Sequence, residues 1–372
     1  MKLSLDHWRS SGMALIIVMI AVLVLSCLAA GFAYSMKVEN RLAFNAREQP
    51  DLTWLGRSGV ELARWVLAQE AMIPGEPYDA LNQIWAGGPG GLGETNSPLA
   101  GIDLTHYPIA DGWVSLKIID LERYANINSA GEPVIRQALT LMGVDADQIS
   151  VISDSIEDWV TPGNLPRIAG AKSDYYEGLN PPYECKSAPM DDISELLLVR
   201  GIWDHPEIYD PQTYGGQATG RNPFHHQLGF GAAPGQTPNY PFGLKDVFTA
   251  ISRGQVNVNT AGRNVLQLLL MSSGMDMDSA GNMADAIIQY RAGPDGQEGT
   301  EDDTPFLNPN QLSAAGVPPQ VVGALSRFCT VRSSTFKVTV TAHLGNLSHE
   351  YTAILFRNGP NSVQVVSFYW EN

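Results

Sequence analysis

The sequence predicts an α+β protein in which a long N-terminal helix packs on a small antiparallel sheet and a large helical insertion interrupts that sheet. Three observations predict this class. An uncharged stretch from Ser11 to Met36 has the length of a long helix, one strand pattern stands far from three others at the C-terminus, and the residues between them contain a repeated helical motif.

The N-terminal stretch is long enough for one membrane span. At about 1.5 Å per residue, a helix from Met13 to Met36 crosses a hydrocarbon core of about 30 Å. A secretory signal peptide is the alternative, but its apolar region normally has about 7 to 15 residues and ends at small residues. Here the small residues Ser10 to Gly12 precede a longer apolar run. This order predicts a segment that is cut on its cytoplasmic side and stays in the membrane.

The helix is predicted to continue beyond the membrane. The residues from Val38 to Arg47 contain no helix breaker, and apolar residues then recur near helical spacing from Leu52 to Val66. We expect Pro50 to kink this helix or to begin a new one. A glycine-rich loop follows at residues 86–91.

Four segments have the alternating or β-branched and aromatic pattern of strands. Asn358-Gly359 predicts the turn between the last two of them. The four predicted strands are residues 112–121, 336–343, 348–356 and 362–370.

An internal repeat lies between the first strand and the other three. Residues 125–130 (Ala-Asn-Ile-Asn-Ser-Ala) are repeated as residues 256–261 (Val-Asn-Val-Asn-Thr-Ala), and further matches follow at the same spacing. A duplicated helical unit is the simplest cause. Ser129 and Thr260 are expected to be helix N-caps in the two copies.

Composition excludes several classes of function. The chain has 372 residues, with 39 acidic and 23 basic side chains and a net charge of −16. An acidic surface repels nucleic-acid phosphates. The sequence also contains no nucleophile elbow, no His-Glu-x-x-His, no phosphate loop and no clustered His/Cys set. It therefore argues against a nucleic-acid-binding protein and predicts that the chain is not an enzyme.

The N-terminal segment resembles the class III signal of pilins and pseudopilins, in which a short leader ends in a glycine before an apolar helix. The resemblance implies that prepilin peptidase cleaves between Gly12 and Met13 and methylates the new amine of Met13. Most members of that family carry a glutamate at the fifth mature position, which is Ile17 here. In pilins this carboxylate pairs with the amine of the subunit above, so its loss is typical of a subunit with nothing above it. An ordinary signal anchor also lacks it.

The inner motifs resemble the helical domain of the GspK family (general secretion pathway protein K), the large minor pseudopilins of type II secretion. The resemblance covers nearly the whole chain except residues 203–255. It implies a pilin-like fold interrupted by an all-helical insertion with a duplicated SAM-like or helix-hairpin-like motif. The matching motifs are Ile156–Trp159, Pro166-Arg167, Gly170-Ala171, Asp174–Tyr176, Pro181–Tyr183 and Glu195–Gly201.

The resemblance implies a division of the chain into five parts. Within the insertion, the repeat copies lie near residues 126–202 and 257–317, with a further insertion at 203–255. The parts are a prepilin-type leader at 1–12, a transmembrane helix at 13–36, the rest of the helix with a loop and the first strand at 37–122, the helical insertion at 123–328, and the C-terminal strands at 329–372.

The resemblance also implies a function without catalysis. The expected protein sits at the tip of the type II secretion pseudopilus, where it starts assembly with minor pseudopilins of the I and J types and with the major pseudopilus. It supports protein export across the outer membrane. A single span holds it in the inner membrane, with the bulk of the chain in the periplasm and residues 1–12 in the cytoplasm.

The densest group of carboxylates lies in a glycine-rich segment at residues 291–305. Calcium takes six to eight oxygen ligands and tolerates irregular geometry. We therefore expect a structural calcium ion here, with a solvated acidic turn as the alternative. The candidate ligands are Asp295, Glu298, Asp302 and Asp303.

The resemblance implies a second calcium site in the first repeat copy. Asp158, Asn164 and Asp174 are its candidate ligands, whereas Thr161 and Lys172 occupy positions that are commonly acidic in relatives.

Two alternatives stay open. Cys185 and Cys329 lie outside the span, where an oxidising compartment permits one disulfide between them, but their separation in sequence does not fix their distance. Residues 256–291 also resemble the helix-hairpin-helix of membrane-anchored DNA receptors in competence or type IV pilus systems. The turn of that hairpin carries Asp276 and Asp278, where the DNA-binding module presents backbone amides to phosphate.

Overall fold

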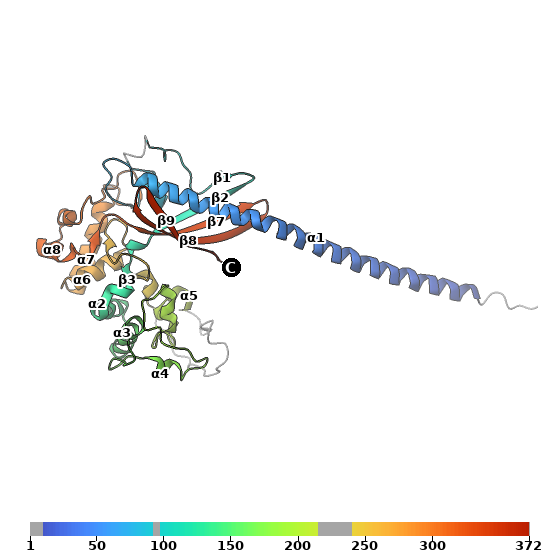
Figure 1. The fold of residues 1–372 in the computed structure, drawn as a ribbon, viewed down its shortest axis with the longest axis horizontal. Coiled ribbons are helices and arrows are strands. Elements are labelled where there is room, and N and C mark those ends of the chain that lie inside the picture. The colour runs from blue at the N-terminus through green and yellow to red at the C-terminus, as the bar shows by residue number, and fades with distance from the viewer. Residues whose placement is uncertain (1–9, 92–96, 215–239, 372) are drawn as a thin grey trace, which may run out of the picture.

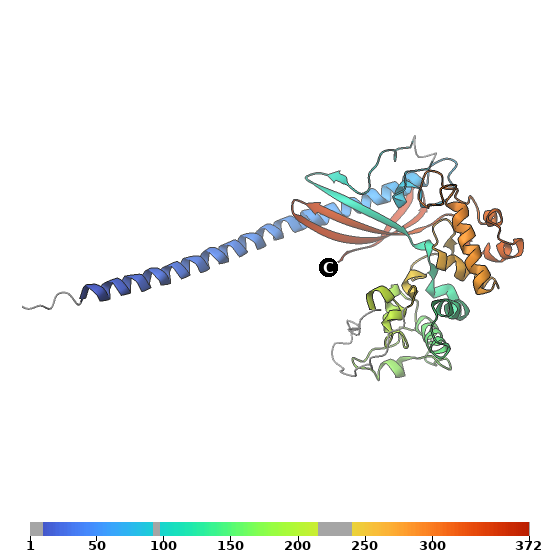
Figure 2. The same cartoon turned by 180° about the vertical axis from the view of Figure 1, so that it is seen from behind.

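The polypeptide forms one long helix, one antiparallel sheet and a helical insertion (Figure 1). The structure, a computed structural model, describes residues 10–91, 97–214 and 240–371, with the backbone alone at 10–13, 44–48 and 371. Helix α1 runs from Ser10 to Glu70. Its first half extends away from the rest of the protein, and its second half lies along the sheet (Figures 1 and 2).

The projecting half of α1 is apolar and uncovered. The 30 residues Ala14–Ala43 have a mean hydropathy of 2.9, and none of this apolar surface is buried inside the protein. Within the described ranges, α1 is the one helix long and apolar enough to cross a membrane. Lipid or the helices of neighbouring proteins must cover such a surface.

Pro50 lies inside α1, which continues without a break to Glu70. Of the two alternatives expected at Pro50, a kink or a new helix, the second was therefore wrong. A proline in a helix interior removes one backbone hydrogen bond and costs about 3 kcal/mol. The residues after it offset this cost, because Leu52 and Leu67 are completely buried in the core between α1 and the sheet.

The sheet has five antiparallel strands in the order β1-β2-β7-β8-β9. The four predicted strands are confirmed to within a few residues, and the short β1 was not predicted. The turn between β8 and β9 is formed by Pro360 and Asn361, not by Asn358-Gly359, because Gly359 still pairs with Ser362 in the ladder. The strands are β1 Tyr107–Ile109, β2 Gly112–Asp120, β7 Thr335–Leu344, β8 Leu347–Gly359 and β9 Ser362–Glu371.

Two glycines bring α1 close to the sheet. A methyl group added at Gly56 would lie 2.4 Å from the ring of Tyr351, and one added at Gly59 would lie 2.4 Å from Val340. Larger side chains at these positions would push the helix off the strands. The core that this contact closes includes Val66, Val114, Leu116, Val338, Ala353 and Leu355.

The insertion lies between β2 and β7 and hangs from the end of the sheet far from the projecting half of α1 (Figure 2). It was expected to be all-helical, but it also contains short strands in two parallel pairs, β3 with β4 and β5 with β6. Its helices are α2 Ile127–Met142, α3 Ala146–Val160, α4 Ser173–Tyr176, α5 Pro211–Tyr214, α6 Arg263–Ser272, α7 Met277–Arg291 and α8 Pro319–Leu325. The short strands are β3 Ala125–Asn126, β4 Phe248–Thr249, β5 Val256–Asn257 and β6 Cys329–Thr330.

In the described part of the chain, short 3-10 helices of one or two turns connect the longer elements. They are η1 Ile84–Ala86, η3 Leu121–Arg123, η4 Ile193–Leu198, η5 Pro206–Ile208, η6 Leu244–Asp246 and η7 Pro309–Ala315.

The two repeat copies have similar local structure. Helices α3 and α7 begin and end at positions related by the repeat spacing, and Gly143 and Gly274 before them both have a left-handed backbone, with φ of 84° and 99°. Each copy starts with a short strand, β3 or β5. One continuous apolar core runs through both copies.

One asparagine ties each copy together. The side chain of Asn128 both donates to and accepts from the backbone of Met190, at 3.0 and 2.7 Å. Asn259 makes the same pair of hydrogen bonds to Phe306, at 2.9 and 2.8 Å. The repeated Asn-x-Asn motif therefore serves loop closure in both copies.

The two expected N-caps were wrong. The N-cap of α2 is Asn126, whose side chain accepts from the backbone of Asn128, and the N-cap of α6 is Gly262. Thr260 does not cap a helix because its hydroxyl donates to the carboxylate of Asp120, which comes from the sheet.

Candidate functional site

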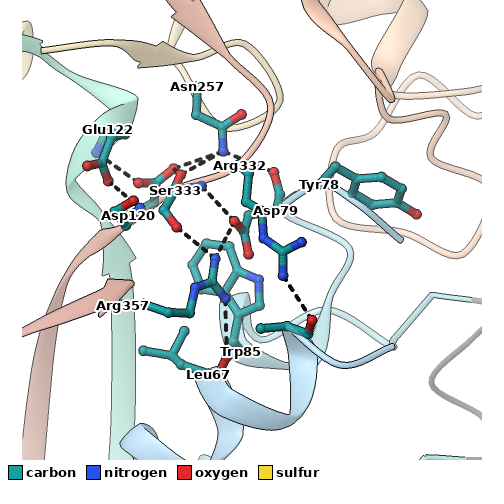
Figure 3. Close-up of polar contacts among 12 residues, drawn as sticks. Leu67, Tyr78, Asp79, Trp85, Asp120, Glu122, Asn257, Arg332, Ser333 and Arg357 are labelled. Atoms are coloured by element: carbon teal, nitrogen blue, oxygen red, sulfur yellow. Dashed lines mark hydrogen bonds and ion pairs between the residues drawn. The ribbon is translucent and has the colours of Figure 1, made fainter. Parts of the chain in front are cut away.

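A buried polar cluster lies where the chain leaves the sheet for the insertion and where it returns (Figure 3). Asp120 comes from the end of β2, Asn257 from β5 and Ser333 from the segment before β7. Each of its members is buried, and several are charged. We call it the junction cluster; it consists of Asp79, Asp120, Glu122, Asn257, Ser333 and Arg357.

Arg357 and Asp79 form an ion pair at the centre of the junction cluster. Nη2 of Arg357 donates to Oδ2 of Asp79 at 2.5 Å and to the carbonyl of Ser333 at 2.8 Å, and Nη1 donates to the carbonyl of Leu67 at 3.2 Å. Both side chains are 2% exposed. The guanidinium also lies 4.8 Å from the ring of Phe336. One arginine on β8 therefore joins α1, the loop after it and the start of β7.

Asp120 joins the end of β2 to the second repeat copy. Its Oδ2 accepts from the hydroxyls of Thr260 at 2.5 Å and Ser333 at 2.6 Å, and from the side-chain amide of Asn257 at 3.1 Å. Burial, together with the negative charge of Glu122, raises the pKa of Asp120 to about 7. The hydrogen bonds oppose this effect because they favour the charged carboxylate.

Glu122 receives the chain as it returns to the sheet. Its Oε2 accepts from the backbone amides of Ser334 and Thr335 at 3.1 and 2.8 Å, and its Oε1 accepts from the hydroxyl of Thr335 at 3.0 Å. The backbone amide of Arg253 donates to the same Oε1 at 3.3 Å. One carboxylate thus holds the entry into β7 and the segment between the two repeat copies.

The junction cluster fixes the insertion to the sheet. Its carboxylates accept hydrogen bonds from neighbouring segments, and most of these interactions join parts of the chain that are far apart in sequence. A solvent-facing cavity of about 290 Å³ lies beside it, lined by polar residues that include Arg253 and Arg332. The sequence patterns described above did not predict this cluster. Its only local signal is the pair of acids, Asp120 and Glu122, at the end of an apolar strand.

The second loop, residues 291–304, holds four of the predicted calcium ligands. Asp302 accepts from the backbone amide of Asp295 at 2.9 Å, and Glu298 pairs with the buried Arg291 at 2.5 Å. Burial raises the pKa of Asp303. In the part of the chain that the structure describes, no three His, Cys, Asp or Glu side chains are placed to share a metal ion. A calcium ion in this loop stays a prediction.

The first loop, residues 161–172, does not bring its predicted ligands together. Asp158 is buried at the end of α3, where it pairs with Arg167, whereas Asn164 and Asp174 are exposed. Oδ2 of Asp158 accepts from the backbone amide of Arg167 at 3.0 Å, and Oδ1 accepts from its guanidinium at 3.3 Å. These residues do not fit a calcium ion, which needs six to eight oxygens.

The predicted disulfide is not formed. Cys185 and Cys329 are both free and buried. The thiol of Cys185 lies 3.7 Å from the carbonyl of Asp158 in the first copy, whereas Cys329 pairs with Val256 in the second. Burial raises the pKa of Cys329 to about 12. Cys185 lies in the first repeat copy, and Cys329 lies on β6 after the second copy, which sequence spacing alone did not reveal.

The predicted processing residues lie at the start of α1. Gly12 and Met13 are in its first turns, and residues 1–9 of the predicted leader lie outside the described part of the chain. The insertion predicted at 203–255 is described only at residues 203–214 and 240–255.

Comparisons with known proteins agree with this architecture. A sequence model of the family described as type II secretion system (T2SS), protein K, matches residues 115–210. The chain is 25% identical over 213 residues to type II secretion system protein K of Aeromonas hydrophila, and 25% identical over 216 residues to that of Pectobacterium carotovorum subsp. carotovorum. Each match covers 52% of this chain, and the chain spans about 60% of the length of these curated relatives.

A solved structure has a similar fold. The GspK-GspI-GspJ complex from enterotoxigenic Escherichia coli contains a chain that matches with a TM-score of 0.60 and 16% identity, over 88% of this chain and 98% of that one. The chain is therefore similar to the protein K family of type II secretion systems, in sequence over residues 115–210 and in fold over most of its length.

The protein K match covers only part of the junction cluster. Residues 115–210 contain Asp120 and Glu122, whereas Asp79, Asn257 and Arg357 lie outside the matched range. The protein K family supplies components of a secretion machine and is not a known enzyme family. This agrees with a site whose polar groups join parts of the fold.

Proposed function

We propose that this chain is a minor pseudopilin at the tip of the type II secretion pseudopilus. There it starts assembly with minor pseudopilins of the I and J types, joins the major pseudopilus and supports protein export across the outer membrane. The observation that carries the proposal is the helix α1. Its first half is apolar and uncovered. Its second half is fixed by the sheet and the junction cluster to the folded part of the chain, the sheet and the insertion, which we call the head.

An apolar helix of this kind can be covered either by lipid or by other apolar helices. In the membrane, lipid covers residues 14–43; in an assembled fibre, the helices of neighbouring subunits would cover the same residues. The proposed contacts use Val18, Val22 and Leu25. Each of these side chains is more than half exposed in the isolated chain. The solved complex of GspK with GspI and GspJ supports the choice of partner class.

The absence of a carboxylate near the start of α1 supports the tip position. Ile17 is apolar and 63% exposed, so it offers no ion pair to the N-terminal amine of another subunit. A charged group in a membrane costs about 2.5 to 3.5 kcal/mol on insertion scales, which selects against it wherever no partner is present. We propose that processing by prepilin peptidase between Gly12 and Met13, with methylation of Met13, releases this end of the helix. The head then lies in the periplasm and the span lies in the inner membrane.

Co-purification tests the proposal. The full-length chain in detergent should pull down the I-type and J-type minor pseudopilins of its own secretion system. Val22→Lys should weaken the complex because it places a charge in the apolar contact, whereas Lys117→Met on the exposed side of β2 should not. The experiment is done in calcium and in chelator. If no complex forms in either condition, the proposed function is wrong.

Position along the fibre needs a second measurement. A photo-crosslinker at residue 22 should capture the other minor pseudopilins, and the chain should be found at one end of isolated fibres. Labelling along the whole fibre length would contradict the tip position while leaving pseudopilin function intact.

A DNA-binding function finds little support in the geometry. In the hairpin between α6 and α7, Asp276 and Asp278 are exposed, and Asp276 accepts from the backbone amide of Ser279 at 3.0 Å. These carboxylates stand where a DNA-binding hairpin would offer donors to phosphate. A saturable titration with duplex DNA at low salt would reverse this conclusion.

A further inference from the structure

The ammonium group of Lys172 is buried beneath the first loop. Lys172 lies just before α4 and is 5% exposed. Its Nζ donates to the carbonyl of Asp158 at 2.5 Å, to the carbonyl of Thr161 at 2.7 Å and to the hydroxyl of Ser187 at 3.2 Å. These acceptors come from the end of α3, the start of the first loop and the segment after Cys185. One cation therefore joins three stretches of chain.

The number of acceptors matches an ammonium ion. A lysine has three N–H donors, and each has one oxygen here. A buried charge without partners is strongly unfavourable, so this set of oxygens is what allows Lys172 to be buried. The set does not match calcium, which needs six to eight oxygens at about 2.3 to 2.6 Å and prefers carboxylates. Two carbonyls and a hydroxyl supply neither the number nor the charge.

Backbone strain at Ser187 supports a specific role for this contact. Ser187 has a φ of 47°, in the left-handed region that residues other than glycine rarely adopt. This conformation places its hydroxyl 3.2 Å from Nζ of Lys172 and 3.4 Å from the carbonyl of Gly163. Strain of this kind persists only when surrounding contacts hold it in place.

A second basic side chain, that of Arg167, forms ion pairs with acidic groups of the same region. The guanidinium of Arg167 pairs with Glu157 at 3.2 Å and with Asp158 at 3.3 Å. The backbone amide of Ala169 donates to Oδ2 of Asp154 at 3.1 Å. The carboxylates of Asp154, Glu157 and Asp158 are therefore already bound by groups of the protein.

We propose that Lys172 takes the place of a bound calcium ion in the first repeat copy. Its ammonium cross-links residues 158–187 through Asp158, Thr161 and Ser187, so this region is ordered without metal. A lysine cannot be removed by a chelator or diluted away. The order of the first loop is therefore independent of calcium concentration, whatever the second loop binds. This inference does not depend on the proposed function.

Hydrogen exchange of the full-length chain in detergent tests the proposal. The measurement follows peptides within residues 158–188, in excess calcium and in excess chelator. We expect the wild-type peptides to exchange equally slowly in both conditions. In Lys172→Met, which keeps the apolar stem but removes the charge, exchange should rise roughly 10- to 100-fold, the range expected for the loss of a hydrogen bond to a charged group. Calcium should not restore protection.

Two controls separate this effect from general damage. Lys117→Met removes one exposed lysine from β2 and should leave the peptides at 158–188 unchanged. Peptides from the second loop report calcium binding there independently. Faster exchange of the wild-type first loop in chelator than in calcium would overturn the proposal, and so would wild-type protection in Lys172→Met. If Lys172→Met does not fold, the wild-type comparison alone decides.

Discussion

The ion pair between Arg357 and Asp79 offers the sharpest test of how the head is held together. The perturbation is Arg357→Met, which keeps most of the side-chain volume and removes the guanidinium. The loss affects the carboxylate of Asp79 and the carbonyls of Leu67 and Ser333, all of which now accept from Arg357. Because both partners are 2% exposed, water cannot replace the lost donors without opening the core.

The expected cost follows from that burial. Removing one partner of a buried pair leaves an uncompensated charge and typically costs about 3 to 5 kcal/mol. Asp79 keeps one donor, the backbone amide of Ser333 at 2.6 Å, which places the expected value toward the lower end of that range. Arg64→Met is the matched control, since the pair of Arg64 with Glu61 is 45% and 53% exposed. Exposed pairs contribute about 0 to 1 kcal/mol.

Urea denaturation of the full-length chain in detergent measures the cost, followed by tryptophan fluorescence. Trp85 reports on this region, because its ring lies 5.3 Å from Phe336, the ring beneath Arg357. A double mutant with Asp79→Asn should be less destabilised than the sum of the two single mutants, since the uncompensated charge is then gone. A cost below about 1 kcal/mol for Arg357→Met, or strict additivity in the double mutant, would refute the reasoning.

Three further results are expected. Burial and Glu122 raise the pKa of Asp120 from 3.8 to about 7, so the folded state binds a proton more tightly than the unfolded state. The free energy of unfolding should therefore fall by up to about 4 kcal/mol as pH rises from about 4 to about 7. Urea titrations at several pH values measure this dependence, which Asp120→Asn should flatten. Gly59→Val should destabilise the head by about 1 to 3 kcal/mol because its side chain meets Val340, whereas Gly31→Ala, with nothing within 4 Å, should not lower the melting temperature. Arg291→Met should lower the free energy of unfolding by about 2 kcal/mol or more and speed hydrogen exchange in the second loop. The reason is that the buried guanidinium of Arg291 donates to two backbone carbonyls at 2.5 and 2.7 Å. Unchanged exchange there would show that other contacts hold the loop.

Local patterns account for what could be predicted well. The apolar stretch in α1, the four strands and the repeated motif each depend on residues close together in sequence, so periodicity and spacing identify them. The strand ends agree with the prediction to within a few residues. The equal bounds of α3 and α7 relative to the repeat spacing show that the duplication is preserved in three dimensions.

The errors have a common cause, because each concerns a local signal that contacts distant in sequence override. Pro50 does not end α1, since burial of the residues after it against the sheet offsets the lost hydrogen bond. Thr260 does not cap a helix, since the buried carboxylate of Asp120 takes its hydroxyl. Cys185 and Cys329, whose pairing the sequence left open, are both free: Cys185 lies beside the end of α3, whereas Cys329 lies on β6.

The sequence by itself determined the long apolar N-terminal helix, the strand order along the chain, the duplication and the resemblance to protein K of type II secretion systems. Only the tertiary structure decided how the insertion is fixed to the sheet and what holds its loops. The junction cluster joins Asp79, Asp120 and Arg357 across most of the length of the chain, and Lys172 finds its acceptors in three separate segments. A buried charge is stable only where the fold places hydrogen-bond or ion-pair partners beside it. Residue spacing does not predict which distant residues become these partners.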